Sequence, residues 1–367
     1  MELSQNITAS SNHINRAEIL EDSEWLELEA FQKQVYLSMR DLVIFFTILI
    51  IPGNTLVLIA TWKERRLHQP NKYFLAFLAV ADLLVGLFVA PFFAYQTDLE
   101  YTSSDRDNMS IHLCRFMLWM DTFALTTSIY SLTTISLDRY LKISKPLLYK
   151  SRMTTSRSIK IIFVIVLIST TLATYSATAR SGSSGILGTG TGPCSWDADF
   201  EKSTIFYLGL TISVFFLPVL VIVIMYTLIF HVAHKRNKML VDGNLGQTIN
   251  NQNERTALRR DMKVIRMLLV VVGVFLLCWG PLFTWILMKY LNTIDRENTS
   301  LSFEYRMHVF AGIANTLPFF NSLCNPIIYV CLDQTYQEAF KRIFRRMMRR
   351  QEARRQQPPI ELRPPRA

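Results

Sequence analysis

Residues 111–140 read IHLCRFMLWMDTFALTTSIYSLTTISLDRY, and this stretch decides the fold. Residues 111–135 are long and apolar enough to cross a hydrocarbon core of about 30 Å, which takes about 20 helical residues. On such a helix Asp121 lies about 10 Å beyond Cys114, and Asp138-Arg139-Tyr140 lies about 27 Å further along. The sequence therefore predicts one transmembrane helix that carries an acidic side chain near one end and a charged triplet at the other.

Six other stretches have the same length and apolar character, namely 41–62, 73–97, 160–179, 204–232, 263–289 and 307–331. Half of the chain is hydrophobic and only 19% is charged, against about 25% in soluble domains. We therefore expect an all-α membrane protein, a seven-transmembrane helix bundle with a short amphipathic eighth helix. Residues 1–40 are predicted to form an extracellular tail, 41–331 the helix domain, and 332–367 the amphipathic helix and a disordered tail.

The distribution of positive charge predicts the orientation. With the amino terminus outside, the segments on the cytoplasmic side hold 29 of the 39 Lys and Arg residues, as the positive-inside rule requires. A basic cytoplasmic face also explains the net charge of +10 without a nucleic-acid partner. The glycosylation sequons at Asn6, Asn108 and Asn298 all fall on the predicted outer side. We expect a multi-pass plasma-membrane protein whose carboxyl terminus is cytoplasmic.

The segment after the seventh crossing has one apolar face and one basic face. The apolar face consists of Tyr336, Phe340, Ile343, Phe344 and Met347. A helix of this kind lies in the interface of an anionic leaflet, so membrane lipids are expected partners. Thr335 is the single Ser or Thr residue beyond Cys331. Clustered phosphosites cannot form there, and we expect only weak arrestin recruitment.

Two acidic side chains, Asp82 and Asp121, lie deep within predicted crossings. An ionisable group inside a bilayer is expensive, so such residues usually serve a function. The alternative is a structural hydrogen-bond anchor. Because the two acids lie at different depths, they are expected to have separate roles.

Short motifs recur in order along the helices, and together they identify the chain as a class A, rhodopsin-like G-protein-coupled receptor by resemblance. The motifs are Gly53-Asn54, Leu78-Ala79-Val80-Ala81-Asp82, Asp138-Arg139-Tyr140, Pro218 with Tyr226, Phe275 with Cys278-Trp279-Gly280-Pro281, and Asn325-Pro326-Ile327-Ile328-Tyr329. The resemblance extends from about residue 40 to 350. It implies a receptor that signals through a heterotrimeric G protein.

The resemblance also implies two interior sites. Asp82, Ser128, Asn321 and Asn325 would hold an allosteric sodium ion, and oxygen ligands suit such a hard cation. No other cofactor is expected. The activation switch would comprise Asp138, Arg139, Tyr140, Asp261, Ile129, Pro218, Phe275, Tyr226 and Tyr329. In the inactive state Arg139 would pair with Asp138 and Asp261. The family's disulfide would join Cys114 to Cys194.

The ligand pocket that the resemblance implies comprises Asp121, Leu125, Trp196, Thr211, Trp279, Leu282, Phe283, Asn315 and Phe319. In the aminergic branch, which this chain resembles most, an Asp at the position of Asp121 pairs with the protonated amine. The chain departs from that branch, however, because Phe319 replaces the usual Tyr and Leu282 replaces an aromatic residue. Leu210, Thr211 and Val214 stand where catecholamine receptors have serines, which disfavours a catechol as ligand. We expect a biogenic or trace-type amine as ligand, with a peptide or another small molecule as the alternative.

A membrane enzyme or transporter is the distant alternative. Gly182-Ser183-Ser184-Gly185 resembles a serine-protease motif but has no apparent transmembrane His as base. A transporter would be expected to show repeats or several charged crossings, and neither is apparent. We therefore expect no enzymatic activity.

Overall fold

The computed structural model describes residues 2–64, 70–102, 110–178, 185, 200–241, 250–291 and 300–355. Within these residues all regular structure is helical, which confirms the expected fold class. The elements are α1 (Glu2–Lys63), α2 (Pro70–Leu84), η2 (Val85–Val89), α3 (Ala90–Tyr101), α4 (Ile111–Ser144), α5 (Pro146–Arg152), α6 (Thr155–Ser176), α7 (Phe200–Leu210), η4 (Thr211–Phe216), α8 (Leu217–Val241), α9 (Asn250–Tyr290), α10 (Leu301–Leu332) and α11 (Gln334–Arg355).

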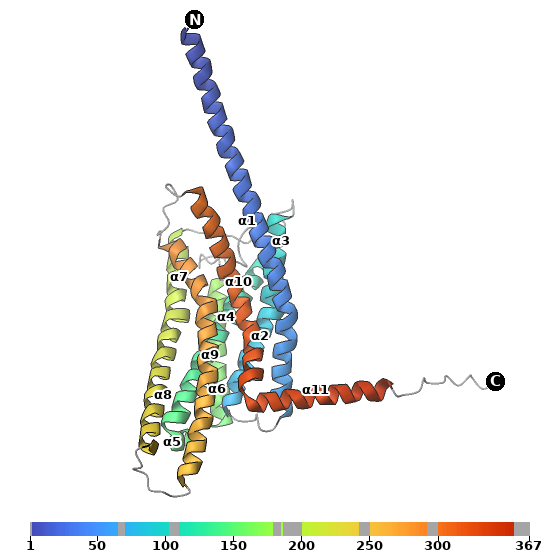
Figure 1. Cartoon of the computed structure of the whole chain (residues 1–367), viewed down its shortest axis with the longest axis vertical. Helices are drawn as coiled ribbons and strands as arrows, with labels where there is room; N and C mark the ends of the chain where they lie inside the picture. The colour runs from blue at the N-terminus through green and yellow to red at the C-terminus, as the bar shows by residue number, and fades with distance from the viewer. Residues whose placement is uncertain are drawn as a thin grey trace, which may run out of the picture.

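The long helices stand side by side as a bundle, and α11 runs across one end of it (Figure 1). Two crossings consist of several elements, α2–η2–α3 and α7–η4–α8, because each contains a π-helical segment. Pro91 follows the first π-helix and Pro218 the second. Proline has no N–H to donate to the preceding turn, so a wider turn at that place is a usual adjustment.

Five of the described helical stretches are long and apolar enough to cross a membrane by composition alone. Helices α4 and α10 fall outside that group although both contribute many residues to the buried interior of the bundle. On α4 the inward hydroxyls bond to the helix itself, for example Thr126 to the Thr122 carbonyl at 2.7 Å and Ser131 to the Thr127 carbonyl at 2.6 Å. Such bonds let several hydroxyls of a polar helix occupy the interior with a hydrogen-bond partner.

Helix α1 begins much earlier than the apolar pattern predicted, since it continues through residues expected to form a tail. The sequence between residues 2 and 51 contains neither Gly nor Pro, so nothing in it interrupts the helix. The extension rises above the bundle in Figure 1. We call the end of the bundle from which it projects the amino-terminal face, and the opposite end, where α11 lies, the carboxyl-terminal face.

At the carboxyl-terminal face, Asp333 separates α10 from α11 and caps the second helix. Its Oδ1 accepts hydrogen bonds from the backbone N–H of Thr335 at 2.9 Å and of Tyr336 at 3.3 Å. Its Oδ2 pairs with the Lys72 ammonium of α2. Burial raises the pKa of Asp333, but Lys72 and the two N–H groups lower it more, so the net pKa lies below the ordinary value. The carboxylate is therefore charged at neutral pH and holds α11 against α2.

Tyr336 completes this junction, which also reaches α1. Its hydroxyl lies 2.9 Å from the Thr61 hydroxyl of α1. Its ring lies under the Lys72 ammonium, 4.7 Å from nitrogen to centroid, and stacks on Tyr329 with centroids 5.7 Å apart. Four helices thus meet at one buried ion pair.

We expect Lys72→Met to destabilise the protein by about 3 to 5 kcal/mol, because it leaves the Asp333 carboxylate buried without a cation. The side chains of Lys72 and Asp333 are only 9% and 12% exposed, so solvent screens the pair weakly. The double variant Lys72→Met/Asp333→Asn should recover most of that loss, since Asn also caps a helix. Thermal unfolding of the purified protein in detergent measures both.

The matched control is Arg342→Ala, which removes the 2.6 Å contact with Glu64 on the same face. Arg342 is 46% exposed, so this change should cost no more than about 1 kcal/mol. If the Lys72 and Arg342 variants unfold at the same temperature, the buried ion pair contributes less to the stability of the fold than we expect.

Candidate functional site

Most of the predicted ligand residues lie in the bundle interior. Asp121 and Leu125 of α4 are each 1% exposed, and Phe319 of α10 is fully buried. Also buried are Thr211 of η4 and Trp279, Leu282 and Phe283 of α9. Leu125, Trp279, Leu282, Phe283 and Phe319 belong to one apolar cluster. Trp196 lies outside the described residues.

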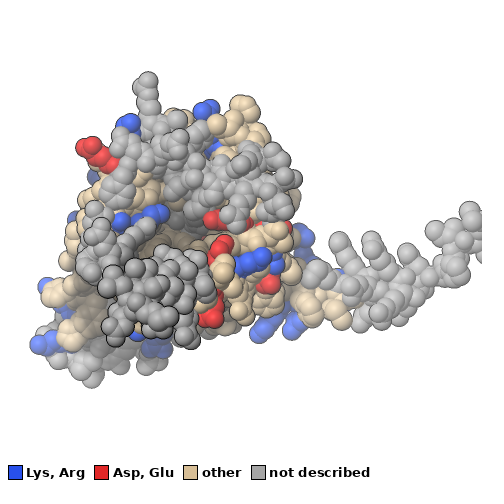
Figure 2. Space-filling view, turned by 90° about the horizontal axis from the view of Figure 1, so that it is seen from above, with Lys and Arg blue, Asp and Glu red and all other residues tan. Residues whose placement is uncertain are grey.

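A cavity of about 210 Å³ opens at the amino-terminal face, between α1, α3, α7, α9 and α10. Seen from above in Figure 2, this face is hollowed, with acidic side chains along the margin of the hollow. Two predicted ligand residues, Leu282 and Asn315, line the cavity. Its lining, as far as the structure describes it, does not include Asp121. The cavity therefore lies on the amino-terminal side of the buried residues as an outer chamber.

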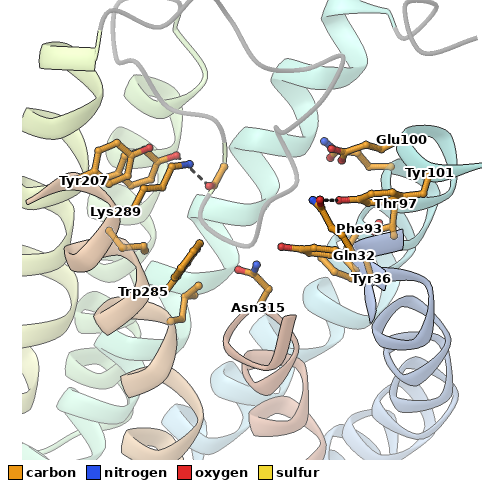
Figure 3. A pocket seen from close by; sticks show the side chains of 15 residues that line it. Gln32, Tyr36, Phe93, Thr97, Glu100, Tyr101, Tyr207, Trp285, Lys289 and Asn315 are labelled. Carbon is orange, nitrogen blue, oxygen red and sulfur yellow. Dashed lines mark hydrogen bonds between the residues drawn. The ribbon is translucent and has the colours of Figure 1, made fainter. Parts of the chain in front are cut away.

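The outer chamber has lining residues that the sequence analysis missed. Gln32 and Tyr36 come from the α1 extension, Glu100 from α3, and Trp285 and Lys289 from α9 (Figure 3). The signal that could have revealed the first two is an inward stripe on α1. Leu28, Phe31, Gln32, Val35, Tyr36 and Met39 recur at helical spacing and are less exposed than most of their neighbours.

Direct contacts fix the α1 extension as a wall of this chamber. Gln32 Nε2 donates to the Tyr101 hydroxyl at 3.1 Å, and the rings of Tyr36 and Tyr101 stack with centroids 5.4 Å apart. Arg40 pairs with Asp98 of α3 at 2.5 Å. On the other side, α10 approaches so closely that a Cβ at Gly312 would lie 3.1 Å from Val35. The extension is therefore packed between α3 and α10.

Asp82 lies at the centre of the second candidate site and is fully buried. Its Oδ2 accepts a hydrogen bond from Asn325 Nδ2 at 2.8 Å. Among the described residues, neither Asp82 Oδ1 nor Ser128 Oγ has a hydrogen-bond partner. Asn321 and Ser322 are also buried, and the sequence analysis missed Ser322. A carboxylate with open oxygen positions among hydroxyl and amide oxygens suits a small hard cation.

This arrangement differs from that of a transition-metal site. The described residues contain no group of three or more His, Cys, Asp or Glu side chains that could hold a metal. One carboxylate with neutral oxygen donors suits sodium better than zinc, which favours His and Cys.

At the carboxyl-terminal face, Asp138 and Arg139 are 2% and 5% exposed. The Tyr149 hydroxyl of α5 donates to Asp138 Oδ1 at 2.9 Å, a contact that the sequence analysis missed. Burial first, and the Asp138 carboxylate second, raise the pKa of Tyr149, so its hydroxyl keeps the proton that it donates. The side chain of Asp261 lies outside the described residues.

The remaining switch residues occupy the interior between the two faces. Ile129 and Phe275 are fully buried, Tyr329 is 1% exposed, and Pro218 and Tyr226 are also buried. Tyr140, at the end of the charged triplet, is half-buried. Phe275 lies against Phe215 of η4, with ring centroids 6.1 Å apart.

The disulfide and the sequons are described only in part. Cys114 is disulfide-bonded, but its predicted partner Cys194 lies outside the described residues. The sequons at Asn108 and Asn298 also lie outside them, as does the side chain of Asn6.

Comparison with known proteins decides the family. The sequence profile of the family described as 7 transmembrane receptor (rhodopsin family) matches residues 53–329. The chain belongs to the rhodopsin family of seven-transmembrane receptors. The receptor is 31% identical over 301 residues to the histamine H2 receptor of Rattus norvegicus, covering 80% of this chain and 75% of that one. It is 30% identical over 297 residues to trace amine-associated receptor 5 of Homo sapiens, covering 80% and 81%.

Membership confirms several predictions. The seven-helix fold, the aminergic branch and the receptor function agree with these relatives, and the family consists of receptors and not enzymes. Coupling to a G protein follows from the family. No comparison tests the individual site residues, which therefore stay predictions.

We expect Tyr149→Phe to raise basal G-protein activation. The change removes the hydroxyl that donates to Asp138 and keeps the aromatic ring. It therefore removes only the hydrogen bond that holds the Asp138 carboxylate in its observed position. A hydrogen bond to a charged group contributes about 1.5 to 3 kcal/mol, which shifts a two-state equilibrium at least about tenfold. Nucleotide exchange on G protein without agonist measures the shift, with Leu148→Ala as the control at the neighbouring exposed position. Unchanged basal exchange in Tyr149→Phe would show that this bond does not restrain activation.

Proposed function

We propose that this receptor lies in the plasma membrane and binds a small extracellular amine, which it reports to a heterotrimeric G protein. The amino-terminal face would be extracellular and the carboxyl-terminal face cytoplasmic. The distribution of Lys and Arg supports this orientation, because 29 of 39 fall in the segments of the sequence that are predicted to be cytoplasmic. The absence of Ser/Thr clusters beyond Cys331 supports weak arrestin recruitment.

The observation that carries the amine proposal is the burial of Asp121. An acidic side chain that is 1% exposed in the middle of a membrane-spanning helix bundle usually serves a function, and a carboxylate there can pair with a cation. A protonated amine that enters from the outer chamber would supply that cation. The relatives named for histamine and for trace amines support the same ligand class.

The residues around Asp121 narrow the class of amine. Leu210, Thr211 and Val214 are all buried, and only Thr211 offers a hydroxyl. A catechol, which presents two adjacent hydroxyls, would leave a polar group without a partner there. Phe93 contacts Phe319 with ring centroids 5.4 Å apart, so this end of the pocket is aromatic and apolar. The geometry favours an amine whose remaining part is apolar or carries a single polar group.

We propose further that sodium stabilises the inactive state of the receptor. A sodium ion on Asp82 Oδ1 with Ser128, Asn321 and Asn325 would hold α2, α4 and α10 in one arrangement. Agonist at Asp121 would favour a second arrangement, in which Arg139 becomes available to the G protein. Because both ligands act on one equilibrium, each lowers the affinity for the other.

We predict that Asp121→Asn loses about 2 to 5 kcal/mol of amine binding, because the ammonium is left buried without its counter-charge. A panel of biogenic and trace-type amines, read out by G-protein activation, identifies the agonist, and competition binding measures the loss. Asp98→Asn is the control, since it removes an acid from a half-exposed ion pair with Arg40 on the same face. Unchanged agonist potency in Asp121→Asn at normal surface expression would favour a peptide or another small molecule as ligand.

We predict that sodium lowers agonist affinity in the native receptor and has no effect in Asp82→Asn. The substitution keeps the size of the side chain and removes the one full negative charge among the proposed ligands. Agonist competition curves with sodium and with N-methylglucamine at equal ionic strength measure the difference. A sodium effect that survives the substitution would assign the ion to another place.

A further inference from the structure

The corner between α5 and α6 lies at the carboxyl-terminal face and carries hydroxyl groups among basic side chains (Figure 1). Residues 150–157 read KSRMTTSR, and the segment 145–160 contains five Lys or Arg residues and no acid. Thr155, the first residue of α6, is exposed there. An enzyme with an acidic substrate groove recognises a hydroxyl by the basic residues on both sides of it.

Most of the hydroxyls at this corner already have a role in the fold. Those of Ser151 and Ser158 donate to backbone carbonyls of the preceding turn, at 3.0 Å and 3.3 Å. Thr154 Oγ1 caps α6 by accepting from a backbone N–H at 3.4 Å. Thr155 and Ser156 differ, because both are exposed and no hydrogen bond among the described residues involves their hydroxyls. Either hydroxyl can therefore be modified without loss of a contact.

The basic residues favour Thr155 over Ser156. Arg152 lies three residues before Thr155, and Arg157 lies two residues after it. Both arginines are exposed. Arg157 Nη1 donates to the Arg152 carbonyl at 3.0 Å, so its guanidinium reaches back across the corner. Two cations thus flank the Thr155 hydroxyl along the chain.

The backbone at this corner is suited to an extended binding groove. Met153 has φ −85° and ψ 97°, and Thr154 has φ −108° and ψ 161°, so both residues that precede Thr155 are already extended. Helix α5 before them has seven residues and none of them is buried. So short a helix is marginal by itself and can unwind at little cost.

We propose that Thr155 is a phosphorylation site for a Ser/Thr protein kinase that recognises basic sequences, and that Arg152 and Arg157 hold the phosphate. Thr155 Oγ1 would attack the γ-phosphorus of ATP while the bond from that phosphorus to the β–γ bridging oxygen breaks. ADP leaves, and the hydroxyl proton passes to the base of the kinase. The proposal rests on the cytoplasmic placement of this face under the proposed function, because ATP-dependent kinases act on that side.

The phosphate would join α5 to α6. It carries a charge of about −1.5 to −2 and offers three acceptor oxygens, which guanidinium groups bind well. Arg152 is the last residue of α5, and Arg157 lies in the first turn of α6. Pairing of both arginines with one phosphate would therefore restrict the corner between the two helices.

This restriction would act on the charged triplet through Tyr149. Tyr149 precedes Arg152 by three residues on α5, and its hydroxyl donates to Asp138 at 2.9 Å. A corner that the phosphate holds in place keeps Tyr149 against Asp138 and favours the inactive arrangement. Phosphorylation would thus lower activation of the G protein.

The first experiment treats the purified full-length receptor in lipid nanodiscs with ATP and the catalytic fragment of protein kinase C, which recognises basic sequences. Fragmentation mass spectrometry should locate the phosphate at Thr155. Thr155→Val should lose it, whereas Ser156→Ala should keep it. Absence of phosphate from Thr155 in the native receptor would overturn the proposal.

The contribution of the arginines is measured as the rate of phosphate incorporation. Arg152→Gln and Arg157→Gln should each slow the reaction at least about tenfold, because each removes a charged contact with the kinase. Lys160→Gln is the matched control, since it removes an exposed positive charge further along α6 and should leave the rate unchanged. Equal rates in all three variants would contradict recognition by Arg152 and Arg157.

The second experiment compares phosphorylated and untreated receptor after removal of the kinase. Hydrogen exchange of the backbone amides in residues 147–153 should slow at least about threefold, because the corner opens less often. Nucleotide exchange on G protein without agonist should fall, and it should not fall in treated Thr155→Val or Tyr149→Phe. Unchanged hydrogen exchange would overturn the role of the phosphate at the corner, and a fall that persists in Tyr149→Phe would overturn the route through Asp138.

Neither experiment uses an agonist, so failure of the amine proposal would not affect them. The orientation is tested separately, by mass spectrometry of receptor from intact cells treated with a phorbol ester to activate the kinase. Phosphate at Thr155 in those cells supports the proposal. Phosphate that appears on the purified receptor but never in the cells would show that this face is not exposed to the cytoplasmic kinase, and the proposal would fall with the orientation.

Discussion

The hydrogen bond from Asn325 to Asp82 joins α10 to α2 at the centre of the bundle, and the other interior contacts are arranged around it. The bilayer offers no water to buried polar groups, so each must find its partner inside the protein. Asn54 meets the same demand for α1, because its amide donates to the carbonyls of Ile50 and Ser322. Beside it, a Cβ at Gly53 would lie 3.2 Å from Pro326. Glycine thus permits the close approach on which the interhelical bond depends.

Because α10 is fixed at this level, it can connect the two faces of the receptor. Towards the amino-terminal face it supplies Asn315 to the outer chamber and Phe319 to the apolar cluster. Towards the carboxyl-terminal face it supplies Tyr329 and ends at Asp333, where the ion pair with Lys72 begins. A displacement of α10 would therefore change the outer chamber, the apolar cluster and the junction at Asp333 together. The interior prolines Pro318 and Pro326 lie between these sites and interrupt the backbone ladder there.

Much of this architecture follows from the sequence, because a bilayer restricts the choice of structure. A run of about 20 apolar residues has to be a helix there, and the motifs around Asp82 and Arg139 place the helices in order. Of the four predicted sodium residues, Asp82 and Asn325 are in direct contact in the structure. Such contacts could be anticipated because a charged side chain inside a bilayer is costly and needs a partner.

The outer chamber could not be predicted in the same way. Outside the bilayer, water can satisfy any polar group, so composition no longer determines where residues 23–40 lie. Gln32 and Tyr36 are ordinary residues whose role comes from the side of α1 that faces Tyr101. Tyr149 is similar, since its contact with Asp138 depends on the short helix α5, which the apolar pattern did not reveal. Local patterns determine each helix, whereas contacts between water-exposed ends depend on the packing of the whole bundle.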